Sequence, residues 1–148
     1  MKTLIATLLT SWLAFTATAG ELTWLTDLPA AQAQAKKEKK LVLMDFTGSD
    51  WCGWCIKLNN DVFSQTEFIE YAKKNLVLVE LDFPSKKPQS AELKAANKKL
   101  QAEHKVTGFP TIIAMSADGK VLWKQPGYMQ GGPKAWIGKL DDARKSGS

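Results

Sequence analysis

Two cysteines, the only ones in the 148-residue chain, stand three positions apart in the sequence Trp-Cys-Gly-Trp-Cys, as Cys52 and Cys55. An apolar run, residues 41–46, ends shortly before them and predicts a buried strand. A strand that leads a dithiol into the first turn of a helix places one sulfur among the free N–H groups of the helix N-terminus, which stabilise a thiolate. The spacing therefore predicts a thiol–disulfide exchange site.

Other uses of two cysteines fit this spacing less well. A disulfide that closes a loop of four residues stabilises a fold by only about 2 kcal/mol on the chain-entropy model. A closed zinc site takes four ligands, whereas this chain offers two sulfurs and one distant imidazole, His104. We interpret His104 as a surface residue near a helix end. Binding of a soft metal ion such as Cu(I) by the two sulfurs stays open as an alternative.

The first nineteen residues have the composition of a secretory signal peptide. Lys2 is followed by an apolar stretch from Leu4 to Phe15, and residues 17–19, Ala-Thr-Ala, form a cleavage signal before Gly20. The apolar stretch is shorter than the roughly 20 residues that span a bilayer. We therefore expect a periplasmic or secreted protein, without stable membrane insertion after cleavage, whose residues 20–148 form one domain. Retention of the segment as an anchor is the alternative.

The chain carries a formal net charge of +5, and its lysines occur in pairs that are spread over several predicted segments. Aromatic residues do not alternate with them, as they do in a groove for single-stranded nucleic acid. We interpret the lysines as solvated helix faces and expect no nucleic-acid partner. A monomer is expected.

Strand and helix patterns alternate along the remaining chain. Asp27 is a candidate N-cap for the first helix, and residues 116–119, Ser-Ala-Asp-Gly, indicate a hairpin turn. A lysine-rich turn is expected at residues 84–88. The predicted strands cover residues 21–25, 41–46, 76–83, 111–115 and 120–124. The predicted helices cover residues 28–40, 52–64, 90–105 and 133–144. The second of these helices is expected to continue, after a break, through residues 68–72.

This order of elements, with the dithiol after the second strand, resembles the thioredoxin fold. The resemblance is carried by Asp45-Phe46, by the Trp-Cys-Gly-Trp-Cys segment, by Gly-Phe-Pro-Thr at residues 108–111 and by Gly127. It covers nearly all of residues 20–148 and is strongest to exported bacterial thioredoxin-like proteins. It implies an α/β architecture in which helices flank a central mixed β-sheet of four to five strands.

The chemistry of disulfide exchange gives the two sulfurs different roles. Cys52, at the start of the helix, is expected to be the more exposed thiolate that attacks a substrate disulfide, and Cys55 to be buried and to resolve the mixed disulfide. Thioredoxin has proline where this chain has Trp54. The N–H groups of Trp54 and Cys55 are both expected to donate to the Cys52 thiolate, which lowers its pKa and makes the disulfide more oxidising.

The resemblance also assigns roles to residues outside the dithiol. Asp45 matches the buried carboxyl group that exchanges protons with the resolving cysteine, and burial should raise its pKa toward neutrality. Phe109 and Pro110 match the cis-proline loop that faces the dithiol and pairs with an extended substrate. The other residues expected to contact substrate are Trp51, Gly53 and Trp54.

Two departures from thioredoxin concern Asp45. The spacing from Asp45 to Cys52 is one residue longer, so that a bulge or loop at Gly48 must absorb the difference. Glu80 stands where thioredoxin carries a lysine, so a second acid replaces a balancing positive charge.

These features predict an exported thiol–disulfide oxidoreductase that acts on protein or peptide thiols and disulfides and exchanges electrons with an upstream redox partner. No cofactor and no metal are expected. A reductase is favoured over an oxidase or isomerase, because the chain shows no dimerisation domain or inserted helical domain beyond the bare fold. The alternatives are a copper-binding or metallochaperone module, and a non-catalytic binding domain that uses its aromatic rim.

Overall fold

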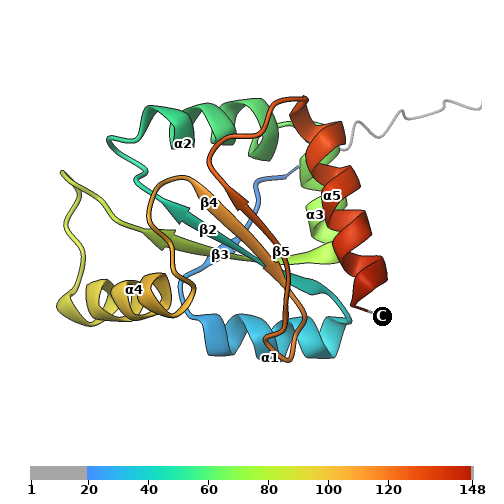
Figure 1. Ribbon diagram of the computed structural model, residues 1–148, viewed down its shortest axis with the longest axis horizontal. Helices are drawn as coiled ribbons and strands as arrows, with labels where there is room; N and C mark the ends of the chain where they lie inside the picture. Colours follow the sequence, from blue (N-terminus) through green and yellow to red (C-terminus); the bar gives the residue numbers. More distant parts are fainter. Residues whose placement is uncertain (1–19, 148) are drawn as a thin grey trace, which may run out of the picture.

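The computed structural model describes residues 20–147, and the predicted signal segment lies outside them (Figure 1). A five-stranded mixed sheet runs through the centre, formed by β1 (Trp24–Leu25), β2 (Leu41–Thr47), β3 (Leu76–Asp82), β4 (Thr111–Met115) and β5 (Val121–Pro126). The strand order is β1-β3-β2-β4-β5. β3 pairs in parallel with β1 and β2, whereas β4 pairs antiparallel with β2 and β5. This is the mixed sheet that the resemblance implied.

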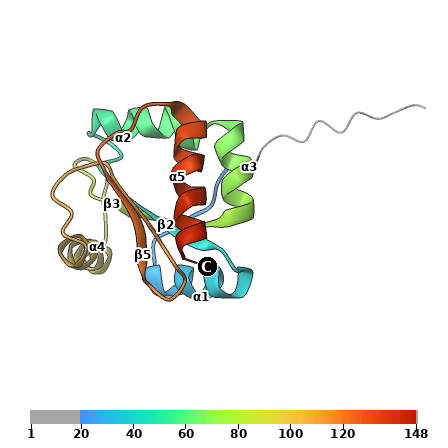
Figure 2. The ribbon, with the colours of Figure 1, turned by 45° about the vertical axis from the view of Figure 1, so that its right-hand side comes forward.

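Helices cover both faces of the sheet. They are α1 (Leu28–Glu38), α2 (Gly53–Leu58), a π-helical turn η1 (Asn59–Phe63), α3 (Thr66–Asn75), α4 (Ala91–Glu103) and α5 (Gly132–Ser146). α1 and α4 lie on one face, and α2, η1, α3 and α5 lie on the other (Figure 2). Every residue of β2 is buried, as its continuous apolar sequence predicts for a central strand. β2 therefore delivers the chain from the middle of the core to the dithiol.

The predicted boundaries differ from the observed ones by one or two residues at several ends, and by more at two places. The first strand has two residues instead of five, because only Trp24 and Leu25 find partners on β3. The helix predicted from Cys52 is not one regular helix but α2 followed by η1, and α3 begins after Ser64 and Gln65. The apolar residues on either side of this break, among them Phe63, pack into one core cluster, which tertiary contacts and not local sequence produce.

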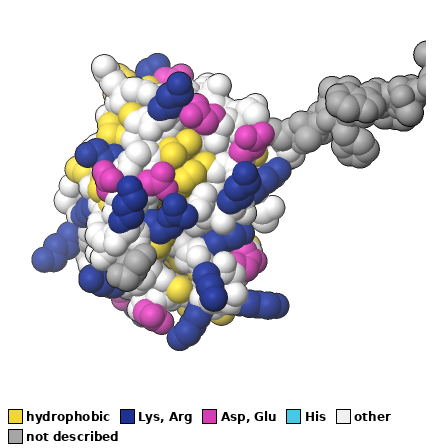
Figure 3. Space-filling model, turned by 90° about the vertical axis from the view of Figure 1, so that its right-hand side faces the viewer, with side chains coloured by type: hydrophobic (Ala, Val, Ile, Leu, Met, Phe, Trp, Pro, Cys, Tyr) yellow, Lys and Arg dark blue, Asp and Glu magenta, His cyan; other side chains and the backbone are white. Residues whose placement is uncertain are grey.

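Charged side chains are spread over the surface. On the face that carries α3 and α5, Lys and Arg side chains alternate with Asp and Glu and do not gather in one patch (Figure 3). No helix within residues 20–147 combines the length and apolar character needed to cross a membrane.

Candidate active site

The dithiol sits at the N-terminus of α2, as predicted. Cys52 is the N-cap residue, and a disulfide joins it to Cys55 in the first turn. The two cysteines are nearly equally buried, with exposed fractions of 7% and 5%. The expectation that Cys52 is the more exposed sulfur concerns the free thiolate, and in this disulfide form the two cysteines are buried to nearly the same extent.

The expected pair of N–H donors to Cys52 is also only half present. The Cys55 N–H donates to Cys52 Sγ at 3.2 Å. The Trp54 N–H makes no such bond within the described residues. With Cys52 as the N-cap, the N–H group that points at its sulfur belongs to Cys55, three positions later, and not to Trp54, two positions later. The disulfide form thus has the Cys55 donor alone, whereas the prediction of a Trp54 donor concerns the free thiolate.

The loop before β4 contains the predicted cis peptide bond, between Phe109 and Pro110. Thr111 Oγ1 donates to the Gly108 carbonyl at 2.7 Å, and the Gly127 N–H donates to the Pro110 carbonyl at 2.8 Å. These two bonds attach the loop to both sides of the hairpin formed by β4 and β5. The hydrogen bonds that hold the cis-proline loop thus involve four of the residues that carried the resemblance: Gly108, Pro110, Thr111 and Gly127.

The two tryptophans beside the dithiol are exposed, Trp51 by 51% and Trp54 by 59%. The Trp51 ring meets Phe109 edge to face at 6.0 Å between centroids, and the Trp54 ring lies 5.6 Å from Tyr128. A groove of about 270 Å³ runs beside the dithiol, lined by Trp54, Phe109, Pro110, Gly127, Tyr128 and Gln130. Exposed aromatic side chains around a groove form the apolar rim that the sequence predicted for peptide binding.

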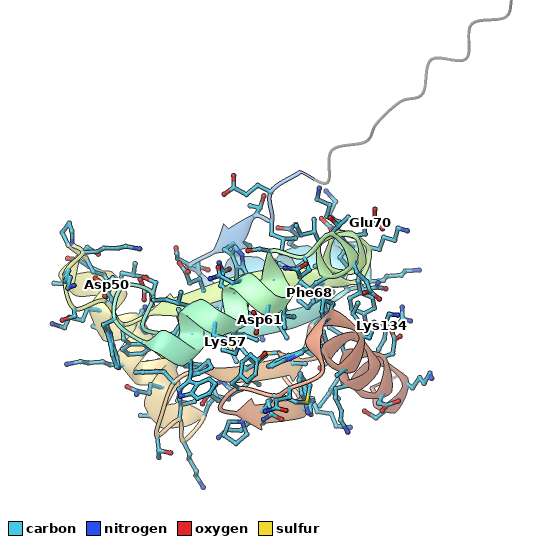
Figure 4. The ribbon with its side chains drawn as sticks, turned by 90° about the horizontal axis from the view of Figure 1, so that it is seen from above. Asp50, Lys57, Asp61, Phe68, Glu70 and Lys134 are labelled. Carbon is cyan, nitrogen blue, oxygen red and sulfur yellow. A yellow bond between two sulfur atoms is a disulfide. The ribbon has the colours of Figure 1, made fainter. Side chains whose placement is uncertain are left out.

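Tyr128 was missed by the sequence analysis, and so was the pair of charges that holds it. The Tyr128 hydroxyl donates to Asp61 at 2.7 Å, and Lys57 Nζ forms a salt bridge with the same carboxylate at 2.7 Å. These contacts lower the pKa of Asp61, first through the bond from Lys57 and then through the one from Tyr128. Lys57 and Asp61 lie one turn apart along α2 and η1 (Figure 4). Their spacing of four residues was the signal available in the sequence.

The loop from Gly48 to Trp51 connects β2 to the dithiol and absorbs the extra residue. β2 stays in unbroken register with β3 as far as Thr47 and Asp82, so the insertion is a loop and not a bulge in the strand. A Cβ on Gly48 would lie 2.5 Å from the Trp51 ring. Glycine is therefore required here by the close approach of that ring, which also donates from Nε1 to the Phe83 carbonyl at 2.8 Å.

A carboxylate in this loop binds the chain after β3. Asp50 accepts hydrogen bonds from the backbone N–H groups of Ser85, Lys86 and Lys87 at 2.7–2.8 Å. These bonds, the one from Ser85 first, hold the pKa of Asp50 below its usual value. Ser49 donates from its backbone and its hydroxyl to Asp82 at 2.9 and 2.6 Å. The loop that carries the dithiol is thus attached to the chain after β3 at several points.

Asp45 lies behind the dithiol in a buried position. Its side chain is 9% exposed, and Oδ1 has no hydrogen-bond partner. Burial, followed by the charges of Glu80 and Asp82, raises the pKa of Asp45 to about 8. A cavity of about 300 Å³ is lined by both Asp45 and Cys55, together with Glu80 and Lys87. The structure therefore brings the predicted carboxyl and the inner cysteine to one cavity.

His104 lies away from this cavity, at the C-cap of α4. Its ring meets Phe46 edge to face at 6.3 Å between centroids, and partial burial lowers its pKa. This position agrees with the interpretation of His104 as a residue near a helix end. Within residues 20–147, no group of three or more His, Cys, Asp or Glu side chains could hold a metal ion.

A dithiol at a helix N-terminus, facing a cis-proline loop on a mixed sheet, defines a thiol–disulfide exchange protein of the thioredoxin superfamily. The chain matches the Thioredoxin-like domain family over residues 28–143 and belongs to it. Among its relatives is the disulfide bond reductase DsbH of Chlamydia pneumoniae, 39% identical over 127 residues, which are 86% of this chain and 75% of the relative. A DsbH oxidoreductase structure has a TM-score of 0.80 and 35% identity over 95% of both chains.

A second relative supports the same chemistry. The thiol:disulfide interchange protein DsbD of Vibrio cholerae is 34% identical over 122 residues, which are 76% of this chain but only 19% of that protein. A thioredoxin from Thermus thermophilus shares the fold, with a TM-score of 0.60 and 19% identity over 86% of this chain and 88% of that one. This chain is accordingly a thiol–disulfide oxidoreductase, and its role in thiol–disulfide redox chemistry is established at that level.

Proposed function

We propose that this chain is an exported reductase of protein or peptide disulfides and is itself reduced by an upstream redox partner. The observation that carries the proposal is the cavity behind the dithiol, which Cys55 and Asp45 both line. On the outer side of the dithiol, exposed aromatic side chains are available to contact a substrate. The direction of electron flow is taken from the relative named as a disulfide bond reductase. Export follows from the composition of residues 1–19.

The reduced protein would act in two steps. The Cys52 thiolate attacks one sulfur of the substrate disulfide, the substrate S–S bond breaks, and a mixed disulfide and one substrate thiolate form. Cys55 then gives its proton to the Asp45 carboxylate and attacks Cys52 Sγ. The mixed disulfide breaks, the second substrate thiolate leaves, and the Cys52–Cys55 disulfide remains for the redox partner to reduce. The Cys55 N–H, 3.2 Å from Cys52 Sγ, is placed to stabilise the attacking thiolate.

The substrate would bind along the groove beside the dithiol. The cis bond before Pro110 suits pairing of the Phe109 backbone with an extended segment, as a short β-bridge. Trp54 lines the same groove, Trp51 meets the Phe109 ring, and Gly53 precedes Trp54, so all three would contact the substrate. The exposed indole rings provide apolar contact area, which is consistent with a peptide and not a small polar molecule as the substrate.

Two cysteine variants test the assignment of the sulfurs. Cys52→Ser should abolish reduction of a disulfide-bonded protein such as insulin, whereas Cys55→Ser should accumulate a mixed disulfide through Cys52 that mass spectrometry of tryptic peptides can locate. A mixed disulfide that forms through Cys55 in the Cys52→Ser protein at the wild-type rate would overturn the assignment.

The reduction potential of the Cys52–Cys55 pair tests the direction. A value near that of thioredoxin, about −270 mV, supports a reductase, and a value near about −120 mV would refute it in favour of an oxidant. The potential is measured by equilibrating the protein with glutathione buffers and quantifying the disulfide form.

A further inference from the structure

A second carboxyl group, that of Glu80, borders the cavity beside the dithiol. Glu80 is the register partner of Asp45 on the neighbouring parallel strand, so the two residues lie side by side across β2 and β3. Both line the cavity of about 300 Å³ that also contains Cys55. Glu80 is half-buried, whereas Asp45 is buried. An accessible acid is therefore placed next to an inaccessible one at the same cavity.

Glu80 also reaches a second cavity, which Asp45 does not line. This one, of about 340 Å³, is bordered by residues of β3, α4 and the chain between them, including Asp82, Pro84, Lys87 and Asn97. Either volume would accommodate several water molecules, at about 30 Å³ each. Glu80 is thus the carboxyl group that connects the surroundings of Cys55 with the side of the molecule where α4 begins.

The charged groups around Glu80 are Asp45 on β2, Asp82 on β3, Lys87 in the chain after β3, and Glu21 before β1, which lines a further cavity together with Glu80. Asp82 accepts two hydrogen bonds from Ser49, so its carboxylate is already engaged. Lys87 Nζ donates to Ser49 Oγ at 3.1 Å and is the cation that lines both cavities. Burial, then the charge of Asp82, raises the pKa of Glu80, while Lys87 opposes the shift.

We propose that Glu80 carries the proton of the resolving step between Asp45 and solvent, through the cavity that both carboxyl groups share with Cys55. The proposal rests on the proposed reductase function. When Cys55 attacks Cys52 Sγ, its proton passes to the Asp45 carboxylate, then through cavity water to the Glu80 carboxylate, and from there to solvent. The like charge of Glu80 also holds Asp45 as a stronger base than an isolated carboxylate. Glu80 acts through Asp45 and does not contact the sulfurs.

The test separates the two steps of the reaction. The reduced protein, in excess, is mixed with the aromatic disulfide 5,5′-dithiobis(2-nitrobenzoate) in a stopped-flow instrument. Attack by Cys52 releases the first thionitrobenzoate, and resolution by Cys55 releases the second, so the two phases report the two sulfurs. Both rates are measured from about pH 5 to about pH 9, across the range in which raised carboxyl pKa values and cysteine thiols titrate.

Glu80→Gln should affect only the second phase. Its plateau rate should fall about threefold to tenfold, and its midpoint should move about one pH unit toward lower pH, because Asp45 loses its neighbouring charge. Glu80→Asp, which keeps the carboxyl group, should restore the midpoint. The control is Glu70→Gln, which removes an exposed carboxylate from α3, remote from the dithiol (Figure 4), and should leave both phases unchanged.

The outcomes are distinguishable. A second phase in Glu80→Gln with the wild-type rate and midpoint overturns the role of Glu80, and so does an equal change in both phases, which would indicate a general structural effect. If the wild-type protein releases no second thionitrobenzoate, the proposed function itself fails, whatever the Glu80 variants show.

Discussion

Replacement of Asp45 by asparagine should make the protein more stable at alkaline pH. Burial, then the charges of Glu80 and Asp82, raises the pKa of Asp45 from 3.8 to about 8 in the folded chain. On unfolding the pKa returns to about 3.9, the value for an exposed aspartate. Between these two values the folded state binds one proton more than the unfolded state. The contribution of Asp45 to stability is therefore fully present below about pH 4 and is lost as the pH rises to about 8.

The size of this loss follows from the difference between the two pKa values. It is about four units, and each unit corresponds to about 1.4 kcal/mol, which gives an upper limit of about 6 kcal/mol above pH 8. The cavity of about 300 Å³ that Asp45 lines has room for water, which would solvate the carboxylate in part and reduce this value. We therefore expect Asp45→Asn, which has the same shape and no ionisation, to raise the free energy of unfolding by about 2–4 kcal/mol at about pH 9 and to change it little at about pH 4.

Urea unfolding of the oxidised protein at several pH values measures this difference. Asp142→Asn is the matched control, because it removes an exposed carboxylate from α5 and should leave the pH dependence as it is in the wild type. If Asp45→Asn and the wild type lose stability with pH along the same slope, the buried Asp45 carboxyl is not what titrates, and the reasoning is refuted.

The same substitution should slow catalysis. Asparagine cannot take the proton of Cys55, and a general base contributes about a hundredfold or more to such a step. The second phase of thionitrobenzoate release should slow by about that factor near pH 7. A variant that is more stable and yet slower would distinguish a proton-transfer role for Asp45 from a purely structural one, for which stability and rate should fall together.

Three further substitutions test the loop at Gly48 and the role of Trp54. Gly48→Ala places a Cβ 2.5 Å from the Trp51 ring. We therefore expect urea unfolding to show a loss of about 1–3 kcal/mol in the free energy of unfolding, and insulin reduction to show a raised KM. Wild-type values in both assays would show that the ring moves freely. Because Cys55 and not Trp54 supplies the N–H donor, Trp54→Pro and Trp54→Ala should give the same Cys52 pKa in thiolate titrations. A clearly higher value for Trp54→Pro would restore the predicted Trp54 donor.

The sequence was sufficient to predict the order of elements because the central strands are marked by continuous apolar runs and the turns by glycine, proline and aspartate. Asp27 illustrates this local information, since its carboxylate accepts from the Ala30 N–H at 2.7 Å and starts α1 where predicted. The break at η1 was less well predicted. Its position depends on how Phe63 packs against Trp24, Phe68 and Trp136, which are distant along the sequence or across the break.

The candidate site was predictable where one segment carries the chemistry and not where two segments meet. The dithiol, Asp45 and the cis-proline loop each have a local pattern or match a familiar motif. Tyr128 could be found only once the chain after β5 was folded back onto α2 and η1, where its hydroxyl meets Asp61 of η1. Glu80 was placed near Asp45 through the resemblance alone, and the register of β2 and β3, which one sequence does not specify, sets the two acids side by side.

The extra residue between Asp45 and Cys52 shows how a departure from thioredoxin can become a structural element. A connection one residue shorter would leave three residues, not four, between the end of β2 at Thr47 and Cys52. Here the added length lets Asp50 accept three backbone N–H groups from the chain after β3, and lets Ser49 bind Asp82. Lys87 contributes one of those N–H groups and also lines the cavity of Asp45 and Glu80. One loop thus holds both the dithiol and Lys87, the cation that lines the cavity of Asp45 and Glu80, so the two departures noted in the sequence, the longer spacing and Glu80, meet at one cavity.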